Sequence, residues 1–331
     1  MKSLSGKVIL VTGATGLVGS HLVDELLNRN AKVVVIGRNE EKIRTVFAEK
    51  LDNRDFSYLV CNIADGIPKQ LGVVDVIFHA ASPISGEEIK SKPIDVIDAN
   101  LVGTRNCLQY LKKQNEKSKI NGRMVVFSSA TVYGNNEKTD KRVFESDTYI
   151  SDSLDSHNSP YSESKRMIEV IANAYYKQYK VDIVIARIGY VYGFSKNKPN
   201  TAFYEFISKA ISGENIILNN SGMGRRDNIY VSDVVSALIF LSVNGKSGEV
   251  YNVSSGGEKE NFKAIDEIAE TIANCVNELN GNDNIKVVVK QNDSDRKPGI
   301  ILNNNKLTEL GWSLHKDIYN GVMDTVKKYR E

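Results

Sequence analysis

The sequence predicts an α/β fold in which a doubly wound parallel sheet is joined to a smaller C-terminal α/β lobe. Short apolar segments alternate with amphipathic helical segments up to about Tyr192. Strands without an alternating polar pattern are typical of parallel sheets, because helices cover both faces of such sheets. The first strand also leads directly into a glycine-rich turn and a helix, which is how sheets of this kind commonly begin.

Six buried strands are predicted from runs of β-branched and aromatic residues. They cover residues 8–11, 33–36, 56–60, 73–78, 124–127 and 183–186. Helical periodicity is clear at 17–27, 93–111 and 159–179, between consecutive strands. Parallel strands need such crossover helices, so this order predicts one continuous parallel sheet.

Beyond Tyr192 the predicted elements become shorter and more polar. They are helices at 202–211, 233–241, 264–279 and 321–329, and strands at 215–218 and 250–253. We therefore expect residues 1–192 to form the sheet domain, with segments near 229–254 returning to it. Residues 193–331 are expected to form mainly a substrate-binding lobe. The connection 134–159 is long for a compact domain, and loops of that length are usually functional.

The composition gives no reason to expect nucleic acid or a membrane as a partner. The formal net charge of the 331 residues is +2, and no apolar run approaches the ~20 residues that span a bilayer. Cys61, Cys107 and Cys275 are far apart and form no CxxC pair. This fits a protein of the reducing cytoplasm without disulfides or structural zinc, and the histidines show no metal-ligand spacing either. No signal peptide is expected at the N-terminus.

The glycine turn predicts a dinucleotide site in a Rossmann-type domain. Gly13 allows a tight turn, Gly16 allows the backbone to approach a pyrophosphate, and Gly19 lets the helix lie close to the sheet. The spacing is GxxGxxG rather than the commoner GxGxxG. The unpaired N–H groups of the helix N-terminus would face the phosphates. Thr15, Leu17 and Val18 complete the loop residues expected to contact the cofactor.

The end of the second predicted strand bears on the choice between NAD and NADP. An acidic residue usually accepts hydrogen bonds from the NAD ribose there, whereas this chain has Gly37 and Arg38. A guanidinium suits a 2′-phosphate, so Arg38 predicts a preference for NADP. The alternative is that Arg38 stacks on adenine and accepts either cofactor.

Candidate catalytic residues lie on the helix that begins near Ser159 and Pro160. Tyr161 and Lys165 are spaced i and i+4, which places them on one helix face. A phenol has an ordinary pKa of about 10, and a nearby ammonium favours its ionised form. Tyr161 could therefore exchange a proton with a substrate hydroxyl while hydride leaves or reaches the adjacent carbon. Ser129, at the end of the fifth predicted strand, could donate a hydrogen bond to the same oxygen.

Taken in order, these motifs resemble the extended short-chain dehydrogenase/reductases, and within them the NAD-dependent epimerase/dehydratase family acting on nucleotide sugars. The matching segments are 11–16, 78–81, 100–104, 128–134, 187–193, 226–233 and 310–312. The resemblance implies homodimers formed through the helices near 93–111 and 159–179, and a nucleotide-diphosphate sugar as substrate. Besides Tyr161 and Lys165, the implied cofactor contacts are Asn62, Ile63, Ala80, Ala81, Ser82, Asn100, Ser128 and Ile188. The implied substrate contacts are Ser82, Ser129, Thr131, Tyr190 and Arg226, and Arg296 is a further candidate phosphate ligand.

Departures from the family pattern bear on the reaction. Dehydratases of the family carry Asp-Glu where this chain has Ala130 and Thr131, and decarboxylases often have Glu in place of Thr131. Both replacements argue against dehydration and decarboxylation. The family's asparagine before the VYG motif is Tyr190, and the acid of its adenine-binding pair is Asn62.

Two reactions at C4 of a nucleotide-diphosphate hexose remain. In 4-epimerisation the same bound cofactor takes hydride and returns it to the other face of the sugar, and the catalytic strand resembles that of 4-epimerases. In the other reaction, NADPH reduces a 4-keto-6-deoxy sugar, which Arg38 and Tyr190 favour. A non-catalytic NAD(P)-binding protein is a third possibility, against which the complete set of Ser129, Tyr161 and Lys165 argues.

Overall fold

The structure is a computed structural model, and it describes residues 4–83, 86–118, 120–134, 140–147, 153–219, 224–258, 260–290 and 299–331. The chain divides into two compact units. The first comprises Met1–Asn135, Thr148–Ile188 and Val235–Tyr251, and the second comprises Asn136–Asp147, Gly189–Val234 and Asn252–Glu331. The division differs from the expected boundary at residue 192 in three respects. The first unit ends at Ile188, so residues 189–192 belong to the second unit. Part of the long connection after residue 134 joins the second unit, and the returning segment is 235–251.

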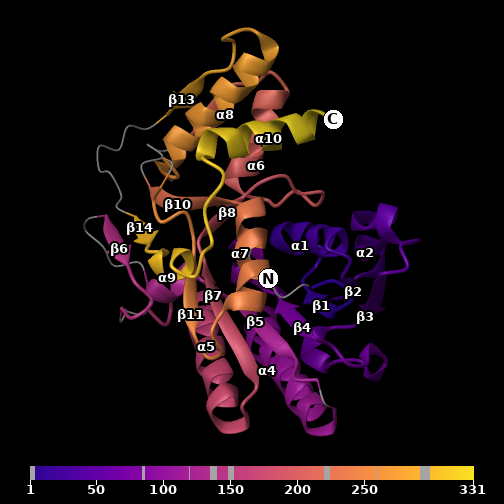
Figure 1. Cartoon of the computed structure of the whole chain (residues 1–331). Coiled ribbons are helices and arrows are strands. Elements are labelled where there is room, and N and C mark those ends of the chain that lie inside the picture. The colour runs from indigo at the N-terminus through magenta and orange to yellow at the C-terminus, as the bar shows by residue number, and fades with distance from the viewer. Residues whose placement is uncertain are drawn as a thin grey trace. The chain divides into compact units, whose positions relative to one another are not determined.

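The first unit contains a seven-stranded sheet of the predicted doubly wound type (Figure 1). Its strand order is β11-β7-β5-β4-β1-β2-β3, and neighbouring strands from β3 to β7 pair in parallel. The strands are β1 (Val8–Thr12), β2 (Lys32–Gly37), β3 (Phe56–Val60), β4 (Val76–His79), β5 (Arg123–Ser129), β7 (Asp182–Ile188) and β11 (Val250–Val253), whose last two residues belong to the second unit.

The fourth strand begins at Val76 and not at residue 73 as predicted. The reason lies at Val74, whose backbone N–H and carbonyl both bond to the side-chain amide of Gln114, at 2.9 and 2.8 Å. That exchange occupies backbone groups that a longer strand would use. Apart from such shifts of a few residues at their ends, the six predicted strands are confirmed.

Helices α4 (Pro93–Lys117) and α5 (Ser159–Tyr179) lie side by side in the first unit (Figure 1). Their inner faces, at Leu108 and Ile168 among others, pack into a core with strand residues such as Leu10, Ile77 and Met124. The unit also contains α1 (Leu17–Asn28), α2 (Glu40–Val46) and α3 (Gly86–Ser91), with short 3₁₀ segments at Ala48–Lys50, Ile63–Asp65, Lys69–Leu71 and Ala130–Tyr133. Helix α7 (Val231–Asn244) contributes residues to both units.

The second unit has three small sheets. Their orders are β12-β10-β8, β13-β9 and β14-β6. The strands are β6 (Lys141–Val143), β8 (Tyr190–Tyr192), β9 (Ile216–Leu218), β10 (Arg225–Tyr230), β12 (Phe262–Ala264), β13 (Val287–Val289) and β14 (Ile300–Leu302). The helices are α6 (Ala202–Ile211), α8 (Ile265–Asn280), α9 (Asn305–Thr308) and α10 (Ile318–Arg330).

Within the described ranges, none of the helices combines the length and the apolar character that crossing a membrane requires. In the same part of the chain, no three His, Cys, Asp or Glu side chains gather in a way that could hold a metal ion.

Candidate functional site

The glycine turn lies between β1 and α1, at the point where the strand order reverses. Sheets of this type bind ligands there, because the loops after β1 and β4 diverge and leave a crevice. Gly13 has φ +65°, and a Cβ placed on it would lie 2.5 Å from the carbonyl carbon and oxygen of Ala80, which follows β4. A Cβ on Gly19 would lie 2.4 Å from the carbonyl oxygen of Gly13. Protein packing alone therefore requires glycine at both positions.

Gly16 differs from the other two glycines. Its backbone is extended, with φ −80°, and a Cβ there would meet only the Gly13 carbonyl oxygen, at 3.4 Å. Nothing in the protein's own packing calls for a glycine at this position. A pyrophosphate lying against the backbone at the N-terminus of α1 would call for one, because that helix end offers unpaired N–H groups. The loop therefore fits the phosphates of a dinucleotide.

The ends of β1 and β4 are fastened together by His79. Its Nδ1 lies 2.7 Å from the Thr12 hydroxyl, which also accepts a hydrogen bond from the Ala81 N–H at 3.3 Å. Burial, together with the nearby charge of Lys165, lowers the pKa of His79 to about 3. The imidazole is therefore neutral at physiological pH. Ala80, Ala81 and Ser82, which sequence reasoning assigned to the cofactor, follow directly and are partly exposed.

The catalytic candidates come from β5 and α5. Pro160 occupies the first turn of α5, as predicted, and Lys165 lies one turn after Tyr161. The Lys165 amine donates a 2.8 Å hydrogen bond to the carbonyl of Phe127, two residues before Ser129, and lies 5.6 Å from the centre of the Tyr161 ring. Burial lowers the pKa of Lys165 to about 7. The amine can therefore lose or gain a proton near neutral pH.

Ser129 is held by Thr131, two residues further along the chain. The Ser129 hydroxyl oxygen accepts hydrogen bonds from the Thr131 N–H at 3.2 Å and from the Thr131 hydroxyl at 3.1 Å. With both acceptor positions of its oxygen occupied, Ser129 retains its own proton for donation to another group. This arrangement suits a hydrogen-bond donor to a substrate oxygen.

Several predicted cofactor residues bond within the protein. Asn100 is buried and donates to Ser164 on α5 at 2.8 Å, and Asn62 caps the 3₁₀ segment that follows it. Through its bond to Ser164, Asn100 braces the helix that carries Tyr161. The side chain of Ile63 lies in the hydrophobic core, and that of Ile188 is 9% exposed at the end of β7.

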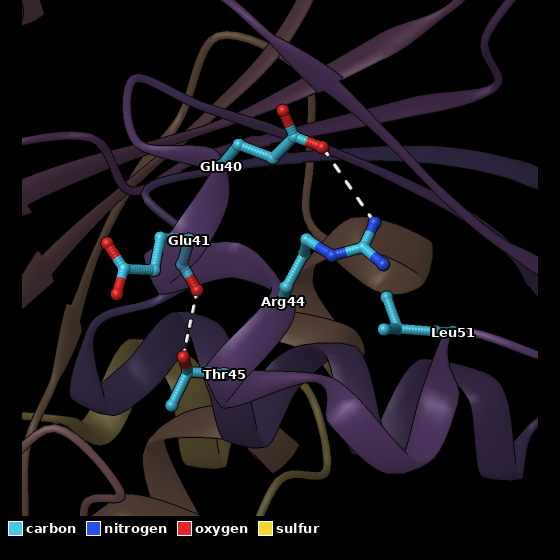
Figure 2. Close-up of a pocket in the computed structure, with 5 residues that line it drawn as sticks. All are labelled: Glu40, Glu41, Arg44, Thr45 and Leu51. Atoms are coloured by element: carbon cyan, nitrogen blue, oxygen red, sulfur yellow. Dashed lines mark hydrogen bonds and ion pairs between the residues drawn. The ribbon is translucent and has the colours of Figure 1, made fainter.

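Arg38 follows β2, and its side chain is exposed. Among the described residues its guanidinium has neither a hydrogen-bond nor an ion-pair partner, so it is available to an anion. Figure 2 shows the next helix, α2, where a surface depression of about 580 Å³ is lined by Glu40, Glu41, Arg44, Thr45 and Leu51. Arg44 is paired there with Glu40 at 3.8 Å and bonds to Tyr58 at 2.7 Å. The depression contains none of the predicted site residues.

In the second unit, two adjacent arginines on β10 have different surroundings. Arg225 pairs with Asp140 at 2.7 Å, and its guanidinium lies 3.9 Å from the centre of the Phe262 ring. Arg226 lies 4.6 Å over the Tyr190 ring and, within the described ranges, forms no hydrogen bond or ion pair through its side chain. Arg226 is therefore the one of the two that can bind a substrate anion. Arg296, the other candidate phosphate ligand, lies outside the described residues.

Sequence reasoning passed over two residues that organise this site. Thr12 holds His79, and Glu169 on α5 accepts hydrogen bonds from Ser128 and Arg187. Glu169 lies one turn beyond Lys165 on the same helix face, and that spacing could have revealed it.

Comparisons with known proteins agree with this geometry. The NAD dependent epimerase/dehydratase family matches residues 9–254. UDP-glucuronic acid decarboxylase 3 of Arabidopsis thaliana is 29% identical over 334 residues, covering 95% of this chain and 86% of the relative. The structure of dTDP-glucose 4,6-dehydratase from Bacillus anthracis, in complex with NAD, is 26% identical with a TM-score of 0.78, covering 98% of this chain and 96% of that one. The structure of UDP-N-acetylglucosamine 4-epimerase from Methanobrevibacter ruminantium, in complex with UDP-N-acetylmuramic acid, shares the fold with a TM-score of 0.80. It is 24% identical and covers 98% of this chain and 99% of that one. The family match spans the glycine turn, β5 and α5, so this chain belongs to the NAD dependent epimerase/dehydratase family.

Proposed function

We propose that this protein is a nucleotide-sugar 4-epimerase, in which Ser129, Tyr161 and Lys165 act on the C4 hydroxyl of a nucleotide-diphosphate hexose. The observation that carries the proposal is which residues surround the Ser129 hydroxyl. Its neighbours at the end of β5 are Ala130 and Thr131, and the Thr131 hydroxyl is bonded to Ser129. Neither side chain carries the ionisable acid and base that loss of water would need, or the ionisable proton donor that would reprotonate the carbon after loss of a carboxylate. Hydride chemistry at C4 needs only one proton carrier.

The protein's own groups then have distinct roles. Tyr161 takes the proton from the C4 hydroxyl and later returns it to the ketone oxygen, while Ser129 donates a hydrogen bond to that oxygen throughout. Lys165 stabilises the ionised phenol. A bound nicotinamide supplies the hydride acceptor and donor. The keto sugar turns between the two transfers, so the C4–H bond that breaks on one face is re-formed on the other.

The remaining contacts are proposed from the positions of single residues. The glycine turn with Thr15, Leu17 and Val18 would hold the cofactor's pyrophosphate, and Ala80, Ala81 and Ser82 would line its nicotinamide half. Arg226, stacked on Tyr190, would bind a phosphate of the substrate. A structure similar to this chain holds NAD, a ligand of the class proposed for the glycine turn.

A second candidate is an NADPH-dependent 4-ketoreductase, and the exposed, unpaired guanidinium of Arg38 favours it. The same residue leads us to propose that NADP binds more tightly than NAD, because a 2′-phosphate would gain a charged, planar hydrogen-bond donor. Dissociation constants of NADPH and NADH, measured by fluorescence, test this preference directly. Equal or tighter binding of NADH would exclude it.

We further propose that the protein is a homodimer formed through α4 and α5. Exposed apolar side chains lie at Ile94 and Val102 on α4 and at Met167 and Val170 on α5, so each helix carries an apolar stripe away from the core. Asp98 and Arg105 lie on the same face of α4 and could pair across a two-fold axis.

The reaction is tested with a panel of UDP-, GDP-, CDP- and dTDP-hexoses, each with and without a 4-keto group, while cofactor absorbance is followed. An epimerase interconverts two hexoses with no net change in NADPH or NADH. A reductase oxidises one NADPH for each product formed. Release of carbon dioxide from a nucleotide hexuronic acid, or formation of a 4-keto-6-deoxy product, would contradict both candidates.

A further inference from the structure

A buried ion pair joins four elements around the catalytic residues. The guanidinium of Arg187, near the end of β7, donates to both carboxylate oxygens of Glu169 on α5, at 2.9 Å from Nε and 2.8 Å from Nη2. The Ser128 hydroxyl, on β5, donates to the same carboxylate. Through Nη1, Arg187 donates to the Tyr133 hydroxyl at 3.0 Å, and its guanidinium lies 4.9 Å from the centre of the Tyr133 ring.

Each member of this network is close in the chain to a proposed catalytic group. Glu169 lies one helical turn beyond Lys165 and two turns beyond Tyr161, on the same face of α5. Ser128 immediately precedes Ser129 on β5. Tyr133 ends the 3₁₀ segment Ala130–Tyr133, which contains Thr131, the partner of Ser129. The ion pair therefore fixes the rotation of α5 against the end of β5 that carries Ser129.

Stability alone does not account for such a pair. The side chains of Arg187 and Glu169 are only 10% and 12% exposed, so both charges lose most of their hydration. Buried ion pairs are often no more stable than apolar residues of similar volume, but a two-pronged contact is demanding in geometry. What the pair provides is a fixed placement of the elements it joins.

We propose that Glu169 and Arg187 are positioning residues that hold Tyr161 and Ser129 in register for the same substrate oxygen. Neither touches the reacting atoms; both act through α5, β5 and the 3₁₀ segment between them. This inference rests on the proposed function, since it assumes that Tyr161 and Ser129 share a substrate oxygen. A misplacement of about 1 Å can reduce turnover by up to about 10²-fold, so a loosened helix should be visible in kcat.

The informative substitution is Arg187→Lys. A lysine keeps the buried positive charge beside Glu169, but a single ammonium cannot reproduce the fork that reaches both carboxylate oxygens and Tyr133. The matched control is Asp182→Asn. Asp182 pairs with Arg123 at 2.8 Å and joins the same two strands, β5 and β7, at their opposite ends. The control therefore loses an arginine–carboxylate contact between these strands, far from the catalytic end.

Both variants are assayed on the nucleotide hexose of the panel that the wild-type protein converts fastest. Turnover is expressed per site that binds NADPH or NADH, whichever binds more tightly, so that unfolded molecules do not count. We expect Arg187→Lys to lower kcat by about tenfold or more while KM and the cofactor dissociation constant change by less than about twofold. Asp182→Asn should retain kcat within about twofold.

If Arg187→Lys does not fold, the double variant Glu169→Leu with Arg187→Met replaces it, because apolar residues remove both buried charges together. The same fall in kcat is expected. A kcat within about twofold of wild type in the folded variant, or an equal loss in Asp182→Asn, would overturn the inference and leave the proposed function standing. A wild-type protein that converts no sugar of the panel would instead refute the proposed function, and the inference with it.

Discussion

Replacing Gly16 by alanine should separate cofactor binding from folding. The backbone there is extended, and the new methyl group would meet only the Gly13 carbonyl oxygen, at 3.4 Å, which is an ordinary contact. We expect the free energy of unfolding without cofactor to change by less than about 1 kcal/mol, the scale of a changed helix N-cap. The methyl group would, however, occupy space that we assign to the pyrophosphate. An extra methyl in a filled site costs about 1–3 kcal/mol, so the cofactor should bind about 5- to 150-fold more weakly.

Two other glycines serve as controls. Gly13→Ala places a methyl 2.5 Å from the Ala80 carbonyl in a left-handed backbone, so it should destabilise the apo protein by about 2 kcal/mol or more. Gly6→Ala has a similar φ of +71° but open space around it, and should lose only about 1 kcal/mol and no cofactor affinity. Urea unfolding of the apo proteins gives the stabilities, and NADPH and NADH fluorescence titrations give the affinities.

Two results would refute this reasoning. Wild-type cofactor affinity in Gly16→Ala would mean that no phosphate lies against the backbone at this position. A loss of apo stability in Gly16→Ala as large as that in Gly13→Ala would mean that packing, and not a ligand, requires the glycine.

Three further predictions concern the catalytic helix and the dimer. Tyr161→Phe should lower kcat by about 10²-fold or more with cofactor affinity retained, and a near-normal rate would remove the phenol from acid–base catalysis. Because burial lowers the pKa of Lys165 from 10.5 to about 7, the unfolded chain holds a proton between these values that the folded protein lacks. The difference in unfolding free energy between wild type and Lys165→Met, measured by urea unfolding, should therefore rise from about pH 7 towards pH 10. The rise should reach up to about 1.4 kcal/mol per pH unit. A difference that stays constant or falls would contradict the burial of the amine. Val170→Glu should convert the dimer to a monomer in sedimentation velocity, because it would bury an unpaired charge in the interface. The control Val60→Glu, at an exposed position of β3, should remain dimeric. Equal behaviour of the two variants would refute the α4–α5 interface.

The parallel sheet could be predicted because its signals are local. Each strand of the first unit is a short apolar run with a helical pattern after it, and the glycine turn marks where the order begins. Pro160 likewise marked the start of α5 within two residues. The prediction that Ser129, Tyr161 and Lys165 act together required only that the end of β5 lie near the first turns of α5. The fold class implies that proximity.

In the small sheets of the second unit, β9 was predicted from the run at 215–218, but the other strands could not be predicted in the same way. Strand β6, Lys141–Val143, lies in a stretch interpreted as loop, and it pairs with Ile300–Leu302, which is far away in the sequence. Such a pairing leaves no periodic signal in three residues. Hydrogen-bond partners could not be predicted either. The sequence places Arg225 and Arg226 side by side, but only the folded structure distinguishes the arginine paired with Asp140 from the one stacked on Tyr190.

The three glycines of the turn are required for different reasons, so they should vary differently among relatives of this chain. A descendant that kept the fold but abandoned the cofactor would still need glycine at 13 and 19, since backbone atoms crowd both positions. At position 16 that need would vanish, because a Cβ there meets only the Gly13 carbonyl oxygen, at 3.4 Å. If Gly16→Ala weakens cofactor binding as predicted, the residue at this one site should report whether a relative of this chain still binds a dinucleotide.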